Sequence, residues 1–141
     1  MKKTLAAIVL VASTSFTVAQ DRLGVAFVQA PEVSTGHCFA ENPIKAFACA
    51  RSSCAIEGIA ESECLRVKWC YPAGWSADIF LQHKEGVHWH QFLCGWSSRE
   101  DLQAAAKLMC EGSQKEWLIE CAMVGLWNPE GKEQSLNQTA Q

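Results

Sequence analysis

Three of the four histidines in this 141-residue sequence lie within eight residues, in the stretch HKEGVHWH. The tripeptide KEG separates two apolar runs, which predicts a β-hairpin whose glycine supplies the positive φ of a tight turn. In a two-residue turn His83 lies directly opposite His88, and His90 shares their face of the hairpin. Side chains in such positions lie about 4.5–8 Å apart, and imidazole nitrogens suit zinc and copper(II). The stretch therefore predicts a metal site with zinc or copper as its cofactor.

A three-residue turn in the same stretch leads to a different structure. His83 would then lie opposite Val87, and the three imidazoles would not converge. The hairpin would present its histidines on a solvated face, with Trp89 buried on the other face. His37 qualifies as a fourth ligand only if the adjacent Cys38 is bonded to the second half of the chain. A metal site and a surface hairpin are thus alternative hypotheses.

Tryptophan is the second residue type that suits a functional site, because the sequence has six tryptophans and one tyrosine. Trp75 and Trp96 each follow a glycine near the end of a predicted segment. An exposed indole in such a place can stack on a sugar or on a partner surface. Trp69, Trp117 and Trp127 are instead predicted to fill a thin core. Trp75 and Trp96 are therefore the candidate binding residues.

Recognised catalytic patterns are absent from the sequence. It contains no GxSxG nucleophile elbow, no phosphate-binding glycine loop and no dinucleotide fingerprint. The tripeptide GWS occurs twice, and each serine is better explained as a turn or helix-cap residue. We therefore expect a non-enzymatic protein, with no cofactor unless the histidines bind metal.

The first 19 residues predict a secretory signal peptide. Lys2 and Lys3 precede an apolar stretch, and Thr17 and Ala19 provide small side chains at the −3 and −1 positions of a cleavage site. No later stretch has the uninterrupted apolar length of a membrane helix. Because the short lysine pair and compact apolar stretch are typical of bacteria, we expect a periplasmic or secreted protein.

The chain that remains after cleavage is short and acidic. It has 141 − 19 = 122 residues, which suits one domain. Loss of two lysines changes the net charge from −3 to −3 − 2 = −5. Since an acidic chain without a basic run does not attract phosphates, nucleic acid is not expected as a partner.

Internal similarity predicts a duplicated unit of about 50 residues, at 22–74 and 77–131. A shift of 53 places FVQ (27–29) on FLQ (80–82). Shifts of 56 and 57 superpose cysteines: Cys38 on Cys94, Cys54 on Cys110, and Cys64 on Cys121. Each unit reads as two strands, a helix and a third strand.

The helices carry recognisable start signals and apolar stripes. Asn42 followed by proline predicts the first N-cap, and Ser97 or Ser98 predicts the second. The expected helix faces are Ile44, Phe47, Ala48 and Arg51 in the first unit, and Leu102, Ala105, Ala106 and Met109 in the second. We therefore predict an α+β fold: two pseudo-symmetric ββαβ repeats in a domain over 20–127, with antiparallel sheet, two helices and disulfides. Residues 128–141 are expected to form a mobile polar tail.

All eight cysteines follow the predicted cleavage site, and an even number in an exported chain predicts disulfides. Cys49 aligns with Ala105 and Cys70 with Trp127, so two cysteines absent together from the second unit are expected to bond to each other. Antiparallel order along helix and strand then predicts the remaining local bonds, and one bond joins the units. The expected pairs are Cys49–Cys70, Cys54–Cys64, Cys110–Cys121 and Cys38–Cys94. Strand periodicity places Arg66 and Lys68 on one face, which indicates a partly exposed strand or a bulge.

The serine-capped, alanine-rich helix that ends in cysteine, followed by a cysteine-marked strand, is SSREDLQAAAKLMCEGSQKEWLIECAMV. It resembles a family of small secreted bacterial cysteine-bearing repeat proteins of unknown function. The resemblance covers about a third of the chain clearly and its first half loosely, whereas Cys49, Cys70 and the histidine hairpin depart from it. It implies fold and export but no activity. We expect an exported, disulfide-stabilised binding protein of the bacterial cell envelope, with a protein or glycan partner; the alternative is a periplasmic zinc- or copper-binding protein.

Overall fold

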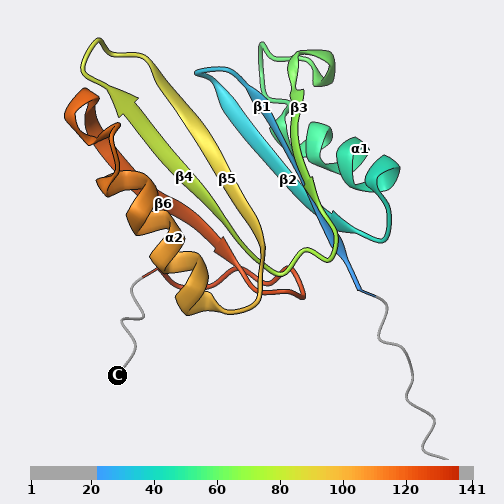
Figure 1. Ribbon diagram of the computed structural model, residues 1–141. Coiled ribbons are helices and arrows are strands. Elements are labelled where there is room, and N and C mark those ends of the chain that lie inside the picture. The colour runs from blue at the N-terminus through green and yellow to red at the C-terminus, as the bar shows by residue number, and fades with distance from the viewer. Residues whose placement is uncertain (1–21, 137–141) are drawn as a thin grey trace, which may run out of the picture.

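The computed structural model describes residues 22–136, which form an α+β fold (Figure 1). The predicted signal peptide, residues 1–19, lies outside the described residues. In chain order the elements are β1 (Gly24–Ala30), β2 (Ser34–Ala40), α1 (Pro43–Cys54), η1 (Glu61–Glu63), β3 (Leu65–Cys70), β4 (Trp75–His83), β5 (His88–Trp96), α2 (Arg99–Glu111), η2 (Lys115–Trp117) and β6 (Leu118–Trp127). The predicted ββαβ order therefore occurs twice.

Each unit builds its own three-stranded antiparallel sheet. The strand orders are β2-β1-β3 in the first unit and β5-β4-β6 in the second, so the first strand of each unit is central. One helix covers the outer face of each sheet, and the inner faces of the two sheets meet between them (Figure 1). Phe27 of β1 stacks on Phe92 of β5, with ring centroids 4.5 Å apart, in this inner layer. The architecture is thus helix, sheet, sheet, helix.

The central strand β1 is buried on both faces, which explains its continuous apolar sequence. Val25 and Phe27 belong to the inner layer between the sheets. Ala26 and Val28 alternate with them and belong to the core beneath α1. Strand periodicity therefore divides one short sequence between two separate cores.

Helix α1 begins as predicted but buries a different face. Asn42 is the N-cap, and its side-chain oxygen accepts a hydrogen bond from the Lys45 amide at 3.0 Å. The buried residues are Ala46, Phe47, Ala50 and Cys54, whereas Ile44 is 80% exposed. The predicted stripe through Ile44 and Ala48 is therefore wrong. Small residues face the sheet because α1 lies directly on Gly36 of β2, where an added Cβ would collide with the Ala50 carbonyl.

Helix α2 confirms both its predicted cap and its predicted stripe. The Ser98 hydroxyl accepts a hydrogen bond from the Asp101 amide at 3.1 Å. Leu102 and Ala106 are buried beneath the helix, and Met109 packs against them. This stripe could be predicted because it contains the large apolar side chains of Leu102 and Met109, whereas the buried face of α1 consists mainly of small residues.

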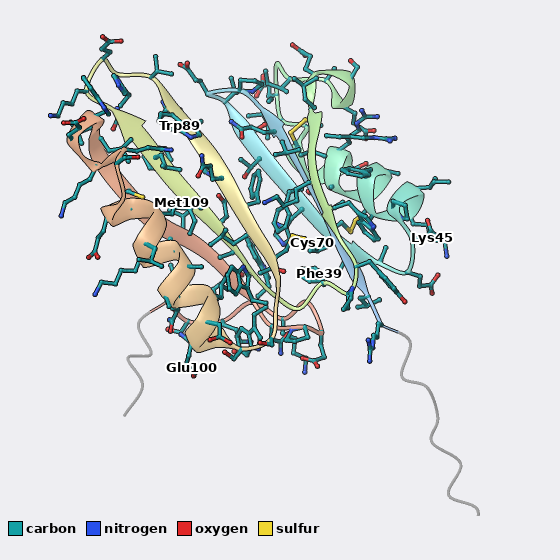
Figure 2. All side chains as sticks on the ribbon, in the orientation of Figure 1. Phe39, Lys45, Cys70, Trp89, Glu100 and Met109 are labelled. Carbon is teal, nitrogen blue, oxygen red and sulfur yellow. A yellow bond between two sulfur atoms is a disulfide. The ribbon has the colours of Figure 1, made fainter. Side chains whose placement is uncertain are left out.

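All eight cysteines form disulfides, and two of the four predicted pairs are wrong. Cys54–Cys64 and Cys110–Cys121 link each helix end to the next strand, as predicted. The predicted Cys49–Cys70 and Cys38–Cys94 bonds are replaced by Cys38–Cys49 and Cys70–Cys94. The physical reason is that Cys38 packs against the core beneath α1, whereas Cys70 and Cys94 belong to the inner layer. Figure 2 shows Cys70 near Phe39, where the two sheets meet.

Strand β3 is exposed over its first four residues, and a shift of register separates its two cations, so both predicted explanations hold. The pairing of β1 with β3 shifts register between Phe27 and Val28. The Arg66 guanidinium consequently lies 4.8 Å from the centroid of the Phe47 ring, beside α1. Lys68 points the other way, and its Nζ donates to the Phe92 carbonyl at 2.6 Å. Each cation therefore has a defined partner.

Residues 128–136 of the segment expected to be a mobile tail fold back on β6. The Asn128 side chain accepts a hydrogen bond from the Lys132 amide at 2.8 Å. The Gln134 amide donates to the Leu126 carbonyl at 2.8 Å. This turn needs no apolar side chains because it satisfies its own backbone groups. Within residues 22–136, no helix has the length and apolar character that crossing a membrane requires.

Candidate functional site

An open pocket of about 1230 Å³ lies at the end of the molecule where the two units join. This junction pocket is formed by the residues just before β1, the β3–β4 linker, the end of β5 and the turn after β6. These four segments lie at the lower end of the ribbon in Figure 1. It is lined by Arg22, Leu23, Tyr71, Pro72, Ala73, Gly74, Gly95, Trp96, Ser97, Pro129 and Glu130. Both units therefore contribute to one surface.

The backbone of the junction pocket is held in place by covalent and hydrogen bonds. The Cys70–Cys94 disulfide comes directly before two lining segments, 71–74 and 95–97. The Gly95 amide donates to the Ala73 carbonyl at 2.7 Å, and the Ala73 amide donates to the Leu23 carbonyl at 2.7 Å. These bonds fix three of the lining segments against one another.

Gly74, which lines the junction pocket, allows the two units to approach each other closely. Its φ of 55° lies in the left-handed region, and an added Cβ would lie only 2.7 Å from the Gly95 carbonyl carbon. Any other residue at this position would therefore force the β3–β4 linker away from β5.

The side chains of the junction pocket combine aromatic faces with polar groups. Tyr71 is 58% exposed, and its ring lies nearly parallel to that of Trp69, with centroids 6.5 Å apart. Arg22 and Glu130, both exposed, contribute one charge of each sign. Within residues 22–136, the side chains of Arg22, Tyr71, Trp96 and Glu130 make no hydrogen bond to the protein. Their polar groups are therefore available to a ligand.

The two candidate tryptophans pair with each other but differ in their access to the junction pocket. Trp75 and Trp96 lie directly opposite each other on β4 and β5, and both are half-buried against the core beneath α2. Trp96 alone of the two lines the junction pocket. Trp127 is buried as predicted, but the prediction of a core position for Trp117 is wrong, since it is 56% exposed.

Sequence reasoning missed Tyr71, Arg22 and Glu130. They are far apart in the chain and belong to no recognisable motif, and only the folded structure brings them together in one pocket. The one available signal was that the single tyrosine directly follows a cysteine.

The histidine stretch forms a hairpin with a three-residue turn, so of the two alternative turns it is the three-residue turn that occurs. The His83 amide donates to the Val87 carbonyl at 2.8 Å, and Gln82 rather than His83 pairs with His88. His83 lies against Trp117, with ring planes 7° from parallel, and its Nδ1 accepts from the Glu85 amide at 3.1 Å. His83 is therefore separated from the other two imidazoles.

His88 and His90 point into the inner layer. His88 Nε2 lies 3.1 Å from the Glu32 carbonyl oxygen, in the β1–β2 turn of the other unit. His90 Nδ1 lies 2.7 Å from Asp78 Oδ1. In the part of the chain that the structure describes, no three His, Cys, Asp or Glu side chains are grouped to hold a metal ion. The predicted site of His83, His88 and His90 is therefore not formed.

Asp78 is the centre of a polar cluster between the sheets. It is only 7% exposed, and besides His90 it contacts the Thr35 hydroxyl of β2 at 3.5 Å. On the opposite sheet His37 packs 4.0 Å from Trp127, between ring centroids. Burial lowers the pKa of His37, while the charges of Asp78 and Glu133 act in the opposite direction. This cluster joins the sheets and is separate from the residues that line the junction pocket.

No family model, no curated protein and no solved structure matches the chain. The resemblance to small secreted cysteine-bearing repeat proteins thus stays a prediction, and the geometry of the junction pocket is the basis on which function is inferred.

Proposed function

We propose that this protein is an exported, disulfide-stabilised binding protein that holds its ligand in the junction pocket. The observation that carries the proposal is that both units line this pocket and that the Cys70–Cys94 bond fixes its walls. A preformed surface loses little conformational entropy on binding, which favours affinity. The ligand is a component of the bacterial cell envelope.

Export is supported by covalent structure. Four disulfides in one small chain are typical of proteins that fold in an oxidising compartment. The predicted signal peptide would deliver the chain to such a compartment. We infer the bacterial periplasm or the surrounding medium.

A binding role is favoured over catalysis by the chemistry of the junction pocket. Its lining contains no histidine or cysteine, and the Ser97 hydroxyl donates at 3.2 Å to the Asp101 carboxylate, which is a much weaker base than an imidazole. Nucleophilic catalysis requires a base beside the nucleophile. The His90–Asp78 pair does not supply it, because it lies between the sheets.

The proposal is tested by affinity capture from an envelope extract of the producing organism. The immobilised wild-type protein should retain a component that the Tyr71→Ala variant does not retain. Trp117→Ala is the matched control, because it removes an equally exposed aromatic ring that does not line the pocket. Equal capture by all three proteins, or no capture by the wild type, would contradict the proposal.

A further inference from the structure

We infer that the ligand of the junction pocket is a neutral oligosaccharide, an inference that rests on the proposed function and names its ligand class. Both the side chains of the pocket and its lack of free backbone groups favour this ligand class.

Rings provide the apolar part of the junction pocket. The lining includes two aromatic residues, Tyr71 and Trp96, and two saturated rings, Pro72 and Pro129. Aromatic side chains with a polar handle suit ligands that are apolar on one side and hydrated on the other. A pyranose ring is such a ligand, because its C–H groups form a face and its hydroxyls form a rim.

The polar groups of the pocket supply donors and acceptors in a mixture that hydroxyl groups match. Arg22 and the Trp96 indole donate, the Glu130 carboxylate accepts, and the Tyr71 hydroxyl does both. None of these side chains has a hydrogen-bond partner within residues 22–136. Because each sugar hydroxyl both donates and accepts, one oligosaccharide can satisfy all of them.

The charge of the pocket favours a neutral ligand. Arg22 and Glu130 balance, so a cation or an anion gains from one charge and is repelled by the other. Neutral hydroxyls can accept from the guanidinium and donate to the carboxylate without that conflict, in charge-assisted hydrogen bonds.

A peptide fits the same pocket less well. An extended peptide commonly binds by adding a strand to a free backbone edge, but Gly95 and Ala73 already use their amides within the protein. A proline-rich peptide docks on aromatic grooves without such an edge. Its backbone offers few donors, because proline lacks an N–H, and it would leave the Glu130 carboxylate without a partner.

The test is calorimetric titration of the folded, disulfide-bonded protein with cellohexaose, chitohexaose and maltohexaose, and with decaproline as the rival. At least one hexaose should bind, and Tyr71→Ala should weaken that binding at least tenfold. Glu130→Gln should weaken it about threefold, since the amide keeps an acceptor but loses the charge. Trp117→Ala should leave the affinity unchanged. Thermal melting of each variant verifies that the fold is retained.

Three outcomes would overturn the inference: no binding of any hexaose at millimolar concentration, hexaose binding that Tyr71→Ala leaves unchanged, or binding of decaproline alone. If envelope material is captured in a Tyr71-dependent way and proves to be protein, the proposed binding function stands and the sugar inference fails. If capture itself does not depend on Tyr71, the binding function fails first.

Discussion

The two units have the same strand order but hold their helices at different distances from their sheets. Val28 pairs with Gly36 in the first hairpin, and Leu81 pairs with Trp89 at the matching place in the second. Glycine lets α1 lie directly on β2, whereas the much larger Trp89 of β5 packs against the core beneath α2. Accordingly, α1 approaches β2 more closely than α2 approaches β5.

The consequence of this difference is a covalent bond that only the first unit contains. Cys38 on β2 and Cys49 on α1 have Cα atoms 5.8 Å apart, within the range of a disulfide. The matching residues of the second unit are Gln91 and Ala105. The size of one strand residue therefore decides whether a helix is near enough to be cross-linked to the strand beneath it.

The largest expected effect concerns the disulfide that links helix to following strand and occurs once in each unit. Cys54→Ala/Cys64→Ala should cost about 4–5 kcal/mol in the free energy of unfolding: about 3 from loop closure and the rest from two buried sulfurs. The Cys110→Ala/Cys121→Ala variant should lose about 3 kcal/mol, because its loop is similar but its sulfurs are only half-buried. Urea denaturation measures both. Equal losses would show that burial of the bridge does not distinguish the units.

The second prediction concerns Gly36. Gly36→Ala should destabilise the protein by about 3 kcal/mol, because the new methyl group meets the Ala50 carbonyl and α1 must move. In the second unit, Trp89→Phe should lower the free energy of unfolding by only about 1 kcal/mol, since the side chains around Trp89 can shift to fill the vacated space. Thermal unfolding of both variants checks the ranking. A harmless Gly36→Ala would mean that α1 is not in close contact with β2.

The third prediction concerns whether a disulfide equivalent to Cys38–Cys49 can form in the second unit. Gln91→Cys/Ala105→Cys places cysteines where the first unit has its Cys38–Cys49 bridge. They should remain reduced, because Trp89 holds α2 away from β5 and a disulfide needs Cα atoms within about 7 Å. Titration of thiols in the folded variant should find both. Loss of both thiols with formation of a local bridge would refute the difference in helix distance.

The smallest expected effect concerns His37, whose matching residue in the second unit is His90. Burial lowers the pKa of His37 below its ordinary value of 6.5, so below pH 6.5 the unfolded chain takes up a proton that the folded protein resists. This contribution to stability is complete above pH 6.5 and is lost as the pH falls through the folded pKa.

His37→Phe tests this contribution, since the aromatic neighbours Phe27 and Trp127 can accept a phenyl ring. The variant should lose less stability than the wild type between pH 7 and pH 5, as measured by urea denaturation at each pH. An identical decline in both proteins would show that the burial of His37 does not contribute to the pH dependence.

Local sequence signals predicted the helices and strands of this fold. Features that depend on contacts between residues far apart in the chain could not be predicted. The Asn42 and Ser98 caps and the apolar strand runs act within a few residues, so they could be recognised. The buried face of α1 could not, because it depends on contact with Gly36 across the core. The tripeptide KEG fits a two-residue or a three-residue turn, so the register of the histidines was undetermined.

The two wrong disulfide predictions came in part from a wrong register between the two units. The strand pairings relate the two hairpins by a shift of 53, which matches Cys38 with Gln91 instead of Cys94. With that register, three cysteines of the first unit, Cys38, Cys49 and Cys70, have no counterpart in the second unit, and Cys38 bonds to Cys49 on the neighbouring helix. Cys94 lies opposite a register shift in β4–β5 pairing and is left to bond with Cys70.

Trp96 was found from sequence because a tryptophan after a glycine is locally conspicuous. The other polar residues of the junction pocket were not found, since Arg22, Tyr71 and Glu130 meet only when the ends of both units come together. A site assembled at a junction leaves little trace in any one stretch of the chain.

The order of the disulfides has a consequence for how the chain matures. The bridges are Cys38–Cys49, Cys54–Cys64, Cys70–Cys94 and Cys110–Cys121, so the cysteines pair consecutively along the chain, the first with the second and the third with the fourth, and no two loops overlap. A chain that enters an oxidising compartment from its N-terminus presents its cysteines in this order. Each pair can close as soon as its second member emerges, before any competing thiol has appeared. Of the 105 connectivities open to eight cysteines, the native one is thus the one that vectorial oxidation produces without reshuffling.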